Sequence, residues 1–255
     1  MKSLKALKSE PQEKKAVVES EPMSGSQLEG MLCEAVDIHI GKRNEPIHKK
    51  VDYFRPSSTN QCARYWYYMF EGVTYTPTFS AQTYRIFDNG HAVHDRLYSY
   101  FREMGILVEE ELPVSNDDPP IQGTADGIID LDGHKLIELK SISTEGFQYR
   151  QLSHKPSDDH VRQANLYMHC LGLDSGFVIY ENKNNQQILP IYIERDDVFL
   201  DKLFKKYRKI YKAVEDKQKP KRPYKSTSKH CARCDLAPMC WAENDVDDEQ
   251  EYEPF

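Results

Sequence analysis

Apolar residues recur along the chain at two spacings, and each spacing predicts one type of secondary structure. A repeat of three to four residues is typical of an amphipathic helix, and apolar residues at every second position are typical of a strand. Ser57 and Ser58 are candidate N-caps of an aromatic-rich helix that ends near Gly72. Further helices are predicted over residues 26–40, 79–104, 157–171 and 196–216. Strands are predicted over residues 106–114, 123–130, 135–142, 176–182 and 186–194.

The order of these elements predicts the fold class. Helices come first, followed by a three-strand meander, a helix, two more strands and a last helix. That order is typical of an α/β domain with a mixed sheet. The chain has 255 residues, which is long enough to bury a sizeable core. We expect a disordered arm at 1–25, one domain at 26–242 and an acidic tail at 243–255.

Neither a membrane span nor a secretory signal is expected. No run approaches the ~18–20 apolar residues of a spanning helix. The first residues also lack the apolar stretch of a signal peptide. We therefore expect a reducing cytoplasm, in which the six cysteines would be thiols or metal ligands rather than disulfides.

Charge is segregated along the chain. The net charge is −7, yet residues 202–229 hold twelve Lys and Arg against two acidic residues, and no basic residue follows Trp241. The basic segment is interpreted either as a track for phosphates, with candidate contacts Lys205, Lys209 and Lys212, or as a solvated helix face. The acidic tail is interpreted as a solubilising segment, a DNA mimic or a ligand for a protein pocket.

The two strands around the turn "DLDG" carry charges that a buried strand pair does not need. A two-residue loop would place Asp126 and Glu138 on opposite faces. A three-residue loop ending at Gly133, in the left-handed conformation, would place them opposite each other, with Lys140 on the same face, and we predict this loop. Two adjacent carboxylates repel unless a cation lies between them, which favours Mg²⁺ or Mn²⁺. An exposed hairpin with solvated charges is the alternative.

"GTAD" followed by "ELK" resembles the signature of PD-(D/E)xK nucleases. The surrounding sequence resembles the branch that contains the RecB and AddB nuclease domains and Cas4. In that branch an upstream helix carries a glycine followed four residues later by a metal-binding histidine, and "FDNGHAVHDRL" supplies Gly90 and His94. A helical Gln-x3-Tyr lies downstream, and "RQANLYM" supplies Gln163 and Tyr167. The resemblance covers residues 55–242 and implies a restriction-endonuclease-like core, a mixed central sheet flanked by helices.

The resemblance also implies roles for these residues. Lys140 would position the attacking water, and Gln163 and Tyr167 would orient the DNA strand, leaving a 5′-phosphate and a 3′-hydroxyl. The metal ligands would be His94, Asp126, Glu138 and the backbone carbonyl of Leu139, with Glu110 or Glu111 as an outer ligand. The catalytic set would be Asp126, Glu138, Lys140, Gln163 and Tyr167. In the aromatic run at 65–68, base stacking is weighed against core packing, and Arg64 and Tyr67 are the candidate DNA contacts.

Three cysteines near the C-terminus, in "HCARCDLAPMCW", have metal-ligand spacing. The fourth ligand is open among Cys33, Cys62, Cys170 and His230, and a zinc knuckle that uses His230 is one solution. Resemblance to Cas4 and AddB favours a [4Fe–4S] cluster held by Cys62, Cys231, Cys234 and Cys240. Such a cluster would clamp the N- and C-terminal helical parts together. Cys33 and Cys170 are then interpreted as ordinary buried thiols.

The combined motifs predict a metal-dependent DNA exonuclease that acts on single-stranded DNA or DNA ends in recombination, repair or replication. A phage or mobile-element origin is favoured, with activity in the cytoplasm of a bacterial or phage-infected cell. The chain has no G-x-x-x-x-G-K-[ST] motif, so a helicase, a recombinase or a single-strand-binding protein is an expected partner. A Cas4 that processes prespacers in CRISPR adaptation and a non-catalytic nucleic-acid-binding module are the alternatives.

Overall fold

The structure is a computed structural model and describes residues 23–242. Its helices are α1 (Gly25–Gly41), α2 (Ala63–Glu71), α3 (Ala81–Glu103), α4 (Thr144–Ser153), α5 (Asp158–Leu171), α6 (Asp197–Glu215) and α7 (Ala237–Ala242). Its strands are β1 (Ile47–Lys49), β2 (Val73–Tyr75), β3 (Leu107–Asn116), β4 (Ile121–Asp130), β5 (His134–Ile142), β6 (Ser175–Asn182) and β7 (Ile188–Glu194).

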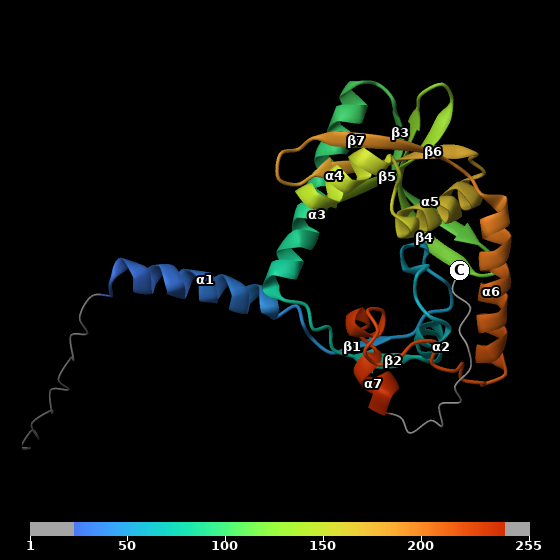
Figure 1. Ribbon diagram of the computed structural model, residues 1–255, viewed down its shortest axis with the longest axis horizontal. Coiled ribbons are helices and arrows are strands. Elements are labelled where there is room, and N and C mark those ends of the chain that lie inside the picture. The colour runs from blue at the N-terminus through green and yellow to red at the C-terminus, as the bar shows by residue number, and fades with distance from the viewer. Residues whose placement is uncertain (1–22, 243–255) are drawn as a thin grey trace, which may run out of the picture.

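The predicted mixed sheet is confirmed. Five strands pair in the order β3-β4-β5-β6-β7. The β5–β6 pair is parallel, and the other three pairs are antiparallel. A parallel pair needs a long crossover, because the chain must return to the same end of the sheet, and α4 and α5 supply it (Figure 1).

Helices cover both faces of this sheet. On one face α3 contributes Val93, Leu97 and Tyr98 to a buried cluster with Ile137 and Leu139 of β5. On the other face α5 packs on alternate residues of the same strands, and that cluster is formed by Leu112, Val114, Ala125, Ile128, Leu136, Phe147, Ala164, Tyr167, Met168, Val178, Tyr180, Ile191 and Ile193. Because strand side chains alternate between faces, β5 presents one set of residues to α3 and another to α5.

A third buried cluster joins segments that are distant in the sequence. Figure 1 shows α2, β1, β2 and α7 gathered at one end of the molecule, with α6 running from that end along the side of the sheet. Phe54 stacks on Tyr207 of α6, with ring centroids 3.9 Å apart, and contacts Trp66 of α2 edge-on. The aromatic run of α2 is therefore mainly core, and it holds the N- and C-terminal parts together.

Three predictions about local structure were incomplete or wrong. Ser57 does not cap α2, nor does Ser58, because both lie in a 3₁₀ helix. The N-cap is Cys62, whose Sγ accepts the N–H of Tyr65 at 3.4 Å. The sequence pattern also missed α4 and the two-stranded sheet of β1 and β2. The other helices and strands are confirmed to within a few residues at their ends, apart from α7, which was not predicted.

The predicted arm lies outside the described residues except for Met23–Gly25, where α1 begins, and the acidic tail lies outside them entirely. Within residues 23–242, no helix combines the length and the apolar character that a membrane crossing requires.

Close approach of β5 and β6 requires a glycine at position 176. A Cβ atom there would lie 2.6 Å from the carbonyl oxygen of Leu136 and 2.7 Å from its Cβ. We expect Gly176→Ala to destabilise the fold by about 1–3 kcal/mol, because the parallel pair must move apart. Urea unfolding measures the loss, and Gly30→Ala, where an added Cβ has no neighbour within 4 Å, is the control. Equal stability of the two variants would contradict the prediction.

Candidate active site

The hairpin between β4 and β5 has the three-residue turn predicted from the sequence. The last antiparallel pair before the turn is Asp130 with His134, and Gly133 has φ +85°. The register continues through Ile129–Lys135, Ile128–Leu136 and Gly127–Ile137. The next position brings Asp126 opposite Glu138, so the predicted register is confirmed.

The two strands separate where the charged residues begin. The regular β4–β5 pairing ends at Gly127, and the N–H of Leu139 donates instead to Oδ2 of Asp126 at 2.6 Å. On its other edge β5 stays paired with β6 as far as Ile142. The Asp126 carboxylate therefore takes the place of a backbone acceptor, and the opening beside it exposes side chains that would otherwise be covered.

His94 reaches the same opening from α3. Its Nε2 lies 3.2 Å from the carbonyl oxygen of Leu139, and its Nδ1 lies 3.8 Å from Oδ1 of Asp126. Three of the groups that sequence analysis assigned to the metal, from α3, β4 and β5, thus contact one another, and the fourth, Glu138, lies close enough to Asp126 for the charge of Asp126 to raise its pKa.

Glu138 is the most unusual residue of the site. Its side chain is fully buried, and neither oxygen accepts a hydrogen bond of normal geometry, although Lys140 Nζ forms an ion pair with Oε1. Burial raises the pKa of Glu138 well above its ordinary value, the charge of Asp126 raises it further, and Lys140 offsets part of the increase. Glu138 is thus a buried acid beside a second acid, and the ion pair with Lys140 offsets only part of the unfavourable negative charge.

Lys140 remains a cation in this setting. Burial alone would lower its pKa, but the negative charges of Glu138 and Asp126 outweigh burial and raise it. A protonated lysine can orient a water molecule or contact a phosphate oxygen, which agrees with the role that the motif implies.

Helix α5 directs two further predicted residues toward the carboxylates. Gln163 Nε2 donates to the hydroxyl of Tyr167 at 3.2 Å, one helical turn away. Burial and then the charge of Glu138 raise the pKa of the Tyr167 hydroxyl, which remains a hydrogen-bond donor at neutral pH. Both side chains therefore lie on the face of α5 that packs over the site.

Sequence analysis missed Tyr98 and Tyr180, two tyrosines whose hydroxyls form hydrogen bonds around the site. The hydroxyl of Tyr98 donates to the backbone oxygen of Asp126 at 2.7 Å and contacts Glu111 at 3.3 Å. Tyr180, fully buried on β6, lies 2.9 Å from Nδ1 of His160 and accepts the N–H of Ser157. Both looked like ordinary apolar positions in the sequence pattern.

The two candidate outer ligands differ in their surroundings. Glu110 pairs with Arg102 at 2.6 Å and is directed to the surface. Glu111 has φ +53°, which is strained for a non-glycine residue, and the register of β3 places it opposite Asp126. Only Glu111 is therefore close to the site.

A groove beside β4 shares Tyr167 with the site. It has a volume of about 730 Å³, and Gln122 and Thr124, which precede Asp126 at alternate positions, line it together with Tyr53 and Arg55. The guanidinium of Arg55 lies 5.8 Å from the Tyr53 ring centroid. A groove of this size with one cation and two aromatic rings has the features that hold a nucleotide.

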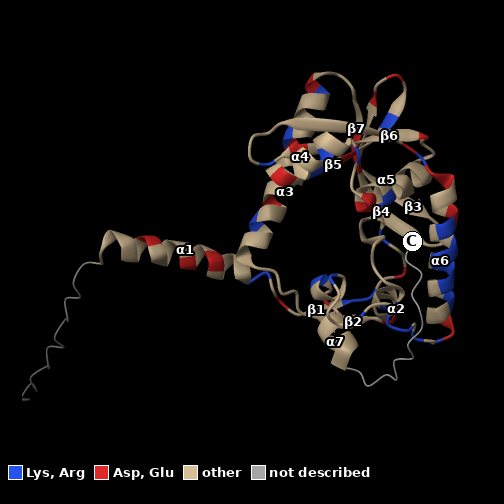
Figure 2. Ribbon diagram, viewed as in Figure 1, with Lys and Arg blue, Asp and Glu red and all other residues tan. Residues whose placement is uncertain are grey.

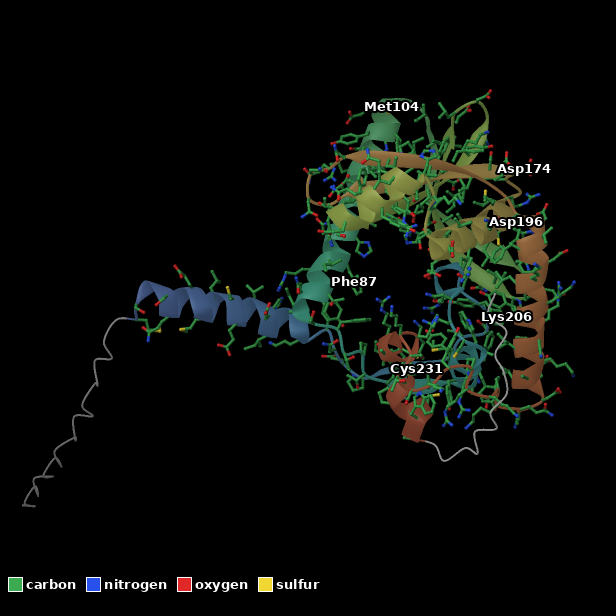
Figure 3. All side chains as sticks on the ribbon, in the orientation of Figure 1. Phe87, Met104, Asp174, Asp196, Lys206 and Cys231 are labelled. Atoms are coloured by element: carbon green, nitrogen blue, oxygen red, sulfur yellow. The ribbon has the colours of Figure 1, made fainter. Side chains whose placement is uncertain are left out.

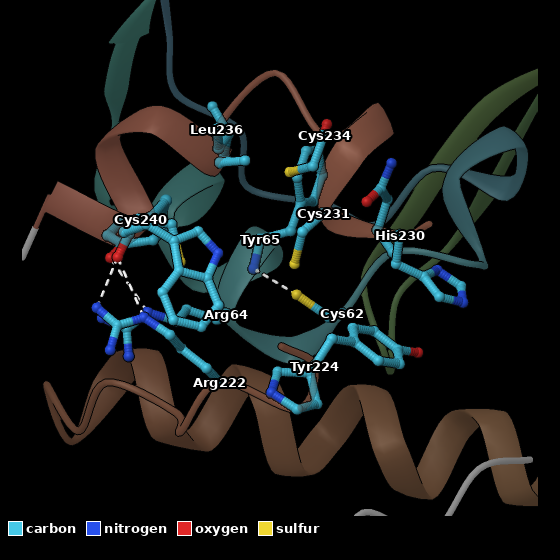
Figure 4. Close-up of a pocket in the computed structure, with 15 residues that line it drawn as sticks. Cys62, Arg64, Tyr65, Arg222, Tyr224, His230, Cys231, Cys234, Leu236 and Cys240 are labelled. Carbon is cyan, nitrogen blue, oxygen red and sulfur yellow. Dashed lines mark hydrogen bonds between the residues drawn. The ribbon is translucent and has the colours of Figure 1, made fainter. Parts of the chain in front are cut away.

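The four cysteines of the predicted cluster line a single cavity at the other end of the molecule. Figure 4 shows Cys62 from the start of α2 facing Cys231, Cys234 and Cys240. Arg222 donates to the carbonyl of Cys240 at 2.7 Å and fixes this wall of the cavity. His230, the alternative ligand, also lines the cavity, where its ring stacks on Tyr224 at 4.3 Å.

Burial favours the neutral thiol at two of these four cysteines. It raises the pKa of Cys62, and it raises the pKa of Cys234 to about 11. Several thiolates can share such a cavity only with a positively charged partner. Within residues 23–242, no three His, Cys, Asp or Glu side chains are arranged as a metal site. The cluster, the zinc alternative and the metal roles of His94, Asp126 and Glu138 therefore remain predictions.

Several predicted residues lie elsewhere than expected. Arg64 and Tyr67 are buried, and Arg64 donates to the carbonyl of Pro220 at 3.2 Å, so their contact with DNA remains a prediction. Cys33 is exposed on α1 rather than buried, and Cys170 is partly buried. Lys212 pairs with Asp216 at 3.2 Å.

No protein-family model and no curated protein matches the chain. Similar solved structures include an alkaline exonuclease, LHK-Exo, from Laribacter hongkongensis, with 17% identity over 72% of this chain and 94% of that one and a TM-score of 0.48. The same exonuclease in complex with dAMP matches with 18% identity over 66% and 90% of the two chains, also at 0.48. SSO0001 matches with 16% identity over 86% and 97%, again at 0.48. Similarity at this level assigns neither family nor activity, which must be argued from the site.

Proposed function

We propose that this protein is a metal-dependent deoxyribonuclease of the PD-(D/E)xK type. The observation that carries the proposal is the buried Glu138 carboxylate, which lies opposite Asp126 with no normal hydrogen bond to either oxygen. Lys140 balances one negative charge through its ion pair with Oε1, but two neighbouring carboxylates with one ammonium leave a net negative charge that a bound cation would balance. A divalent ion with oxygen ligands, Mg²⁺ or Mn²⁺, fits the donor set.

The proposed ligands are His94, Asp126, Glu138 and the carbonyl of Leu139. Contacts among His94, Asp126 and Leu139 support this set, as does the effect of the Asp126 charge on Glu138. When bound, the ion would polarise the scissile phosphate and make water a better nucleophile. Lys140 would orient the attacking water and offset charge that develops on the phosphate, because its ammonium lies beside Glu138. Gln163 and Tyr167 would hold a phosphate oxygen or the sugar through hydrogen bonds.

The groove along β4 supports a polynucleotide substrate. Thr124, two residues before Asp126, lines it, and Arg55 and Tyr53 would provide a phosphate contact and a stacking surface. We propose that one DNA strand lies in this groove, as in an exonuclease that acts on single strands or on ends. Roles in recombination, repair or replication, or in CRISPR adaptation, rest on the sequence resemblance alone.

We further propose a structural [4Fe–4S] cluster in the cysteine cavity, with Cys62, Cys231, Cys234 and Cys240 as ligands. The convergence of all four thiols from the two ends of the domain supports it. The cluster would hold α2 and α7 together and would take no part in the hydrolytic step.

The first test is cleavage of end-labelled single-stranded DNA by anaerobically purified protein. We expect shortening of the DNA with Mn²⁺ or Mg²⁺, none with EDTA, and 5′-phosphate products. Binding without cleavage under every divalent ion would contradict the nuclease proposal and favour a non-catalytic binding module.

A further inference from the structure

A histidine that the proposed mechanism does not use lies in the first turn of α5. His160 is three residues before Gln163 and seven before Tyr167, so the three side chains share one face of the helix. Figure 3 shows the side chains that fill the space between α5 and the sheet, where Tyr167 is buried. His160 is only partly buried. Its ring therefore lies on the face of α5 that carries the site residues, with part of its surface open to a ligand.

The contacts of Tyr180 fix which nitrogen of this ring carries the proton. The Tyr180 side chain is fully buried, and its hydroxyl accepts the N–H of Ser157 at 2.9 Å and lies 2.9 Å from Nδ1 of His160. A buried hydroxyl also needs an acceptor for its own hydrogen. Within residues 23–242, Nδ1 of His160 is the acceptor in reach. The hydroxyl therefore donates to Nδ1, and the proton of the neutral ring is on Nε2.

The surroundings of His160 combine a neutral donor with two cations. Burial, followed by the positive charges of Lys140 and Arg150, lowers the pKa of His160 to about 4. Figure 2 shows basic residues on β5 and α4, the elements that carry Lys140 and Arg150. In the part of the chain that the structure describes, the Nε2–H group has no hydrogen-bond partner. A ligand with an oxygen acceptor and a negative charge would satisfy this donor and be attracted by both cations.

His160 and Tyr167 mark two ends of the site. The hydroxyl of Tyr167 lies near Glu138, whose charge raises its pKa, and the Tyr167 side chain lines the groove beside β4. At the other end, Lys140 is the register partner of Tyr180 on β6, so their side chains lie on the same face of the sheet. Seven residues of helix separate His160 from Tyr167 by about 10 Å. A strand that leaves the groove and passes the carboxylates and Lys140 would therefore come next to His160.

We infer that His160 holds the DNA strand by donating its Nε2–H to a phosphate oxygen next to the reacting phosphate, on the side away from the groove. Tyr180 is the positioning residue, because it keeps the proton on Nε2. A phosphate oxygen is an acceptor of the required charge. The inference rests on the proposed function and adds to it a contact on the second side of the scissile bond.

The test compares two substitutions that each retain one nitrogen of the ring. In His160→Asn the side-chain oxygen can take the place of Nδ1 and accept from Tyr180, but nothing replaces Nε2. In His160→Gln the longer amide can place an N–H donor where Nε2 lies, but Tyr180 loses its acceptor. Binding of a labelled single-stranded oligonucleotide is followed by fluorescence anisotropy in EDTA, so that cleavage has no part in the result. Unfolding in urea is measured for both variants.

We expect His160→Asn to bind the oligonucleotide about tenfold more weakly, because it loses a hydrogen bond to a charged group. Its midpoint in urea should stay close to that of the unmodified protein. His160→Gln should bind within about threefold of the unmodified protein, although its midpoint falls. The reverse order of binding would mean that His160 acts only through Tyr180, and it would overturn the inference. Equal binding by the two variants would overturn it as well.

A second assay identifies the phosphate and keeps this inference apart from the proposed function. Bis(p-nitrophenyl) phosphate has a single phosphodiester, so it has no neighbouring phosphate for His160 to hold. His160→Asn should hydrolyse it within about twofold of the unmodified rate, while kcat/KM on DNA falls about tenfold. An equal loss on both substrates would overturn the placement of His160. If the unmodified protein hydrolyses neither substrate, the nuclease proposal fails, and the anisotropy result still decides whether His160 contacts a strand.

Discussion

Replacing Glu138 with glutamine is expected to abolish DNA cleavage while leaving the protein folded. Glutamine keeps the size and shape of the side chain but cannot supply the negative charge that a divalent ion needs. Because that ion would activate the nucleophile and polarise the phosphate together, we expect a loss of about a thousandfold or more. Asp126 and His94 would keep their contacts to Leu139, so the geometry around the missing charge should be retained.

The measurement is the rate of Mn²⁺-dependent cleavage of labelled DNA under single-turnover conditions. Glu109→Gln is the matched control, because Glu109 is an exposed carboxylate on strand β3 of the same sheet. The control should cleave at nearly the rate of the unmodified protein. A Glu138→Gln protein that cleaves at more than about a tenth of that rate would remove Glu138 from the catalytic set.

Thermal stability gives the same variant a second, independent readout. In the folded protein without metal, the pKa of Glu138 is raised above its ordinary value of 4.5 by burial and by Asp126. Stability from this group is therefore complete below about pH 4.5 and is lost as the pH rises from there through the raised pKa. Glu138→Gln removes this loss, so at pH 8 without metal it should unfold at an equal or higher temperature. Mn²⁺ should then stabilise the unmodified protein and not the variant.

The hairpin shows how far the sequence could specify the site. The parity of the loop depends only on the turn residues and on which side chains must be buried, so the opposition of Asp126 and Glu138 follows from "DLDG" and the flanking isoleucines. The separation of the two strands does not follow, because it depends on Asp126 accepting the N–H of Leu139 in place of a backbone carbonyl. Tyr98 of α3 donates to the backbone oxygen of Asp126. The residues around Tyr98 do not predict this contact, because it too depends on the tertiary structure.

The elements that sequence analysis missed have weak apolar patterns. In α4 only Phe147 is buried, while Tyr149 and Leu152 are exposed, so its large apolar residues share no face and give no helical period. The exposure of the α6 lysines was also beyond the sequence pattern. The orientation of α6 is set by which of its apolar residues reach Phe54 and α2, among them Tyr207, and these contacts leave Lys206 partly buried while Lys205 stays exposed.

Replacing Cys62 with serine is expected to remove the cluster and much of the stability of the fold. Serine retains the capping of α2, because its hydroxyl accepts the N–H of Tyr65 at least as well as the thiol does. The substitution therefore isolates the role of the sulfur as a ligand from its role as a cap. Without the ligand, residue 62 is no longer tied to residues 231–240, and the unfolded chain regains most of its freedom. The expected loss is about 4–5 kcal/mol by loop-closure entropy.

The measurements are the visible absorption of anaerobically purified protein, its iron content and its midpoint in urea. Cys33→Ser and Cys170→Ser are matched controls, since Cys33 is exposed on α1 and Cys170 lies on α5, outside the cavity. Both controls should keep the colour, although partial burial gives Cys170→Ser a small loss of stability. A colourless unmodified protein that contains zinc would contradict the cluster. If the protein contains zinc, and its stability is kept in Cys62→Ser but lost in His230→Ala, His230 is the fourth ligand. In that case all four zinc ligands lie in the C-terminal segment, and the metal does not join this segment to α2.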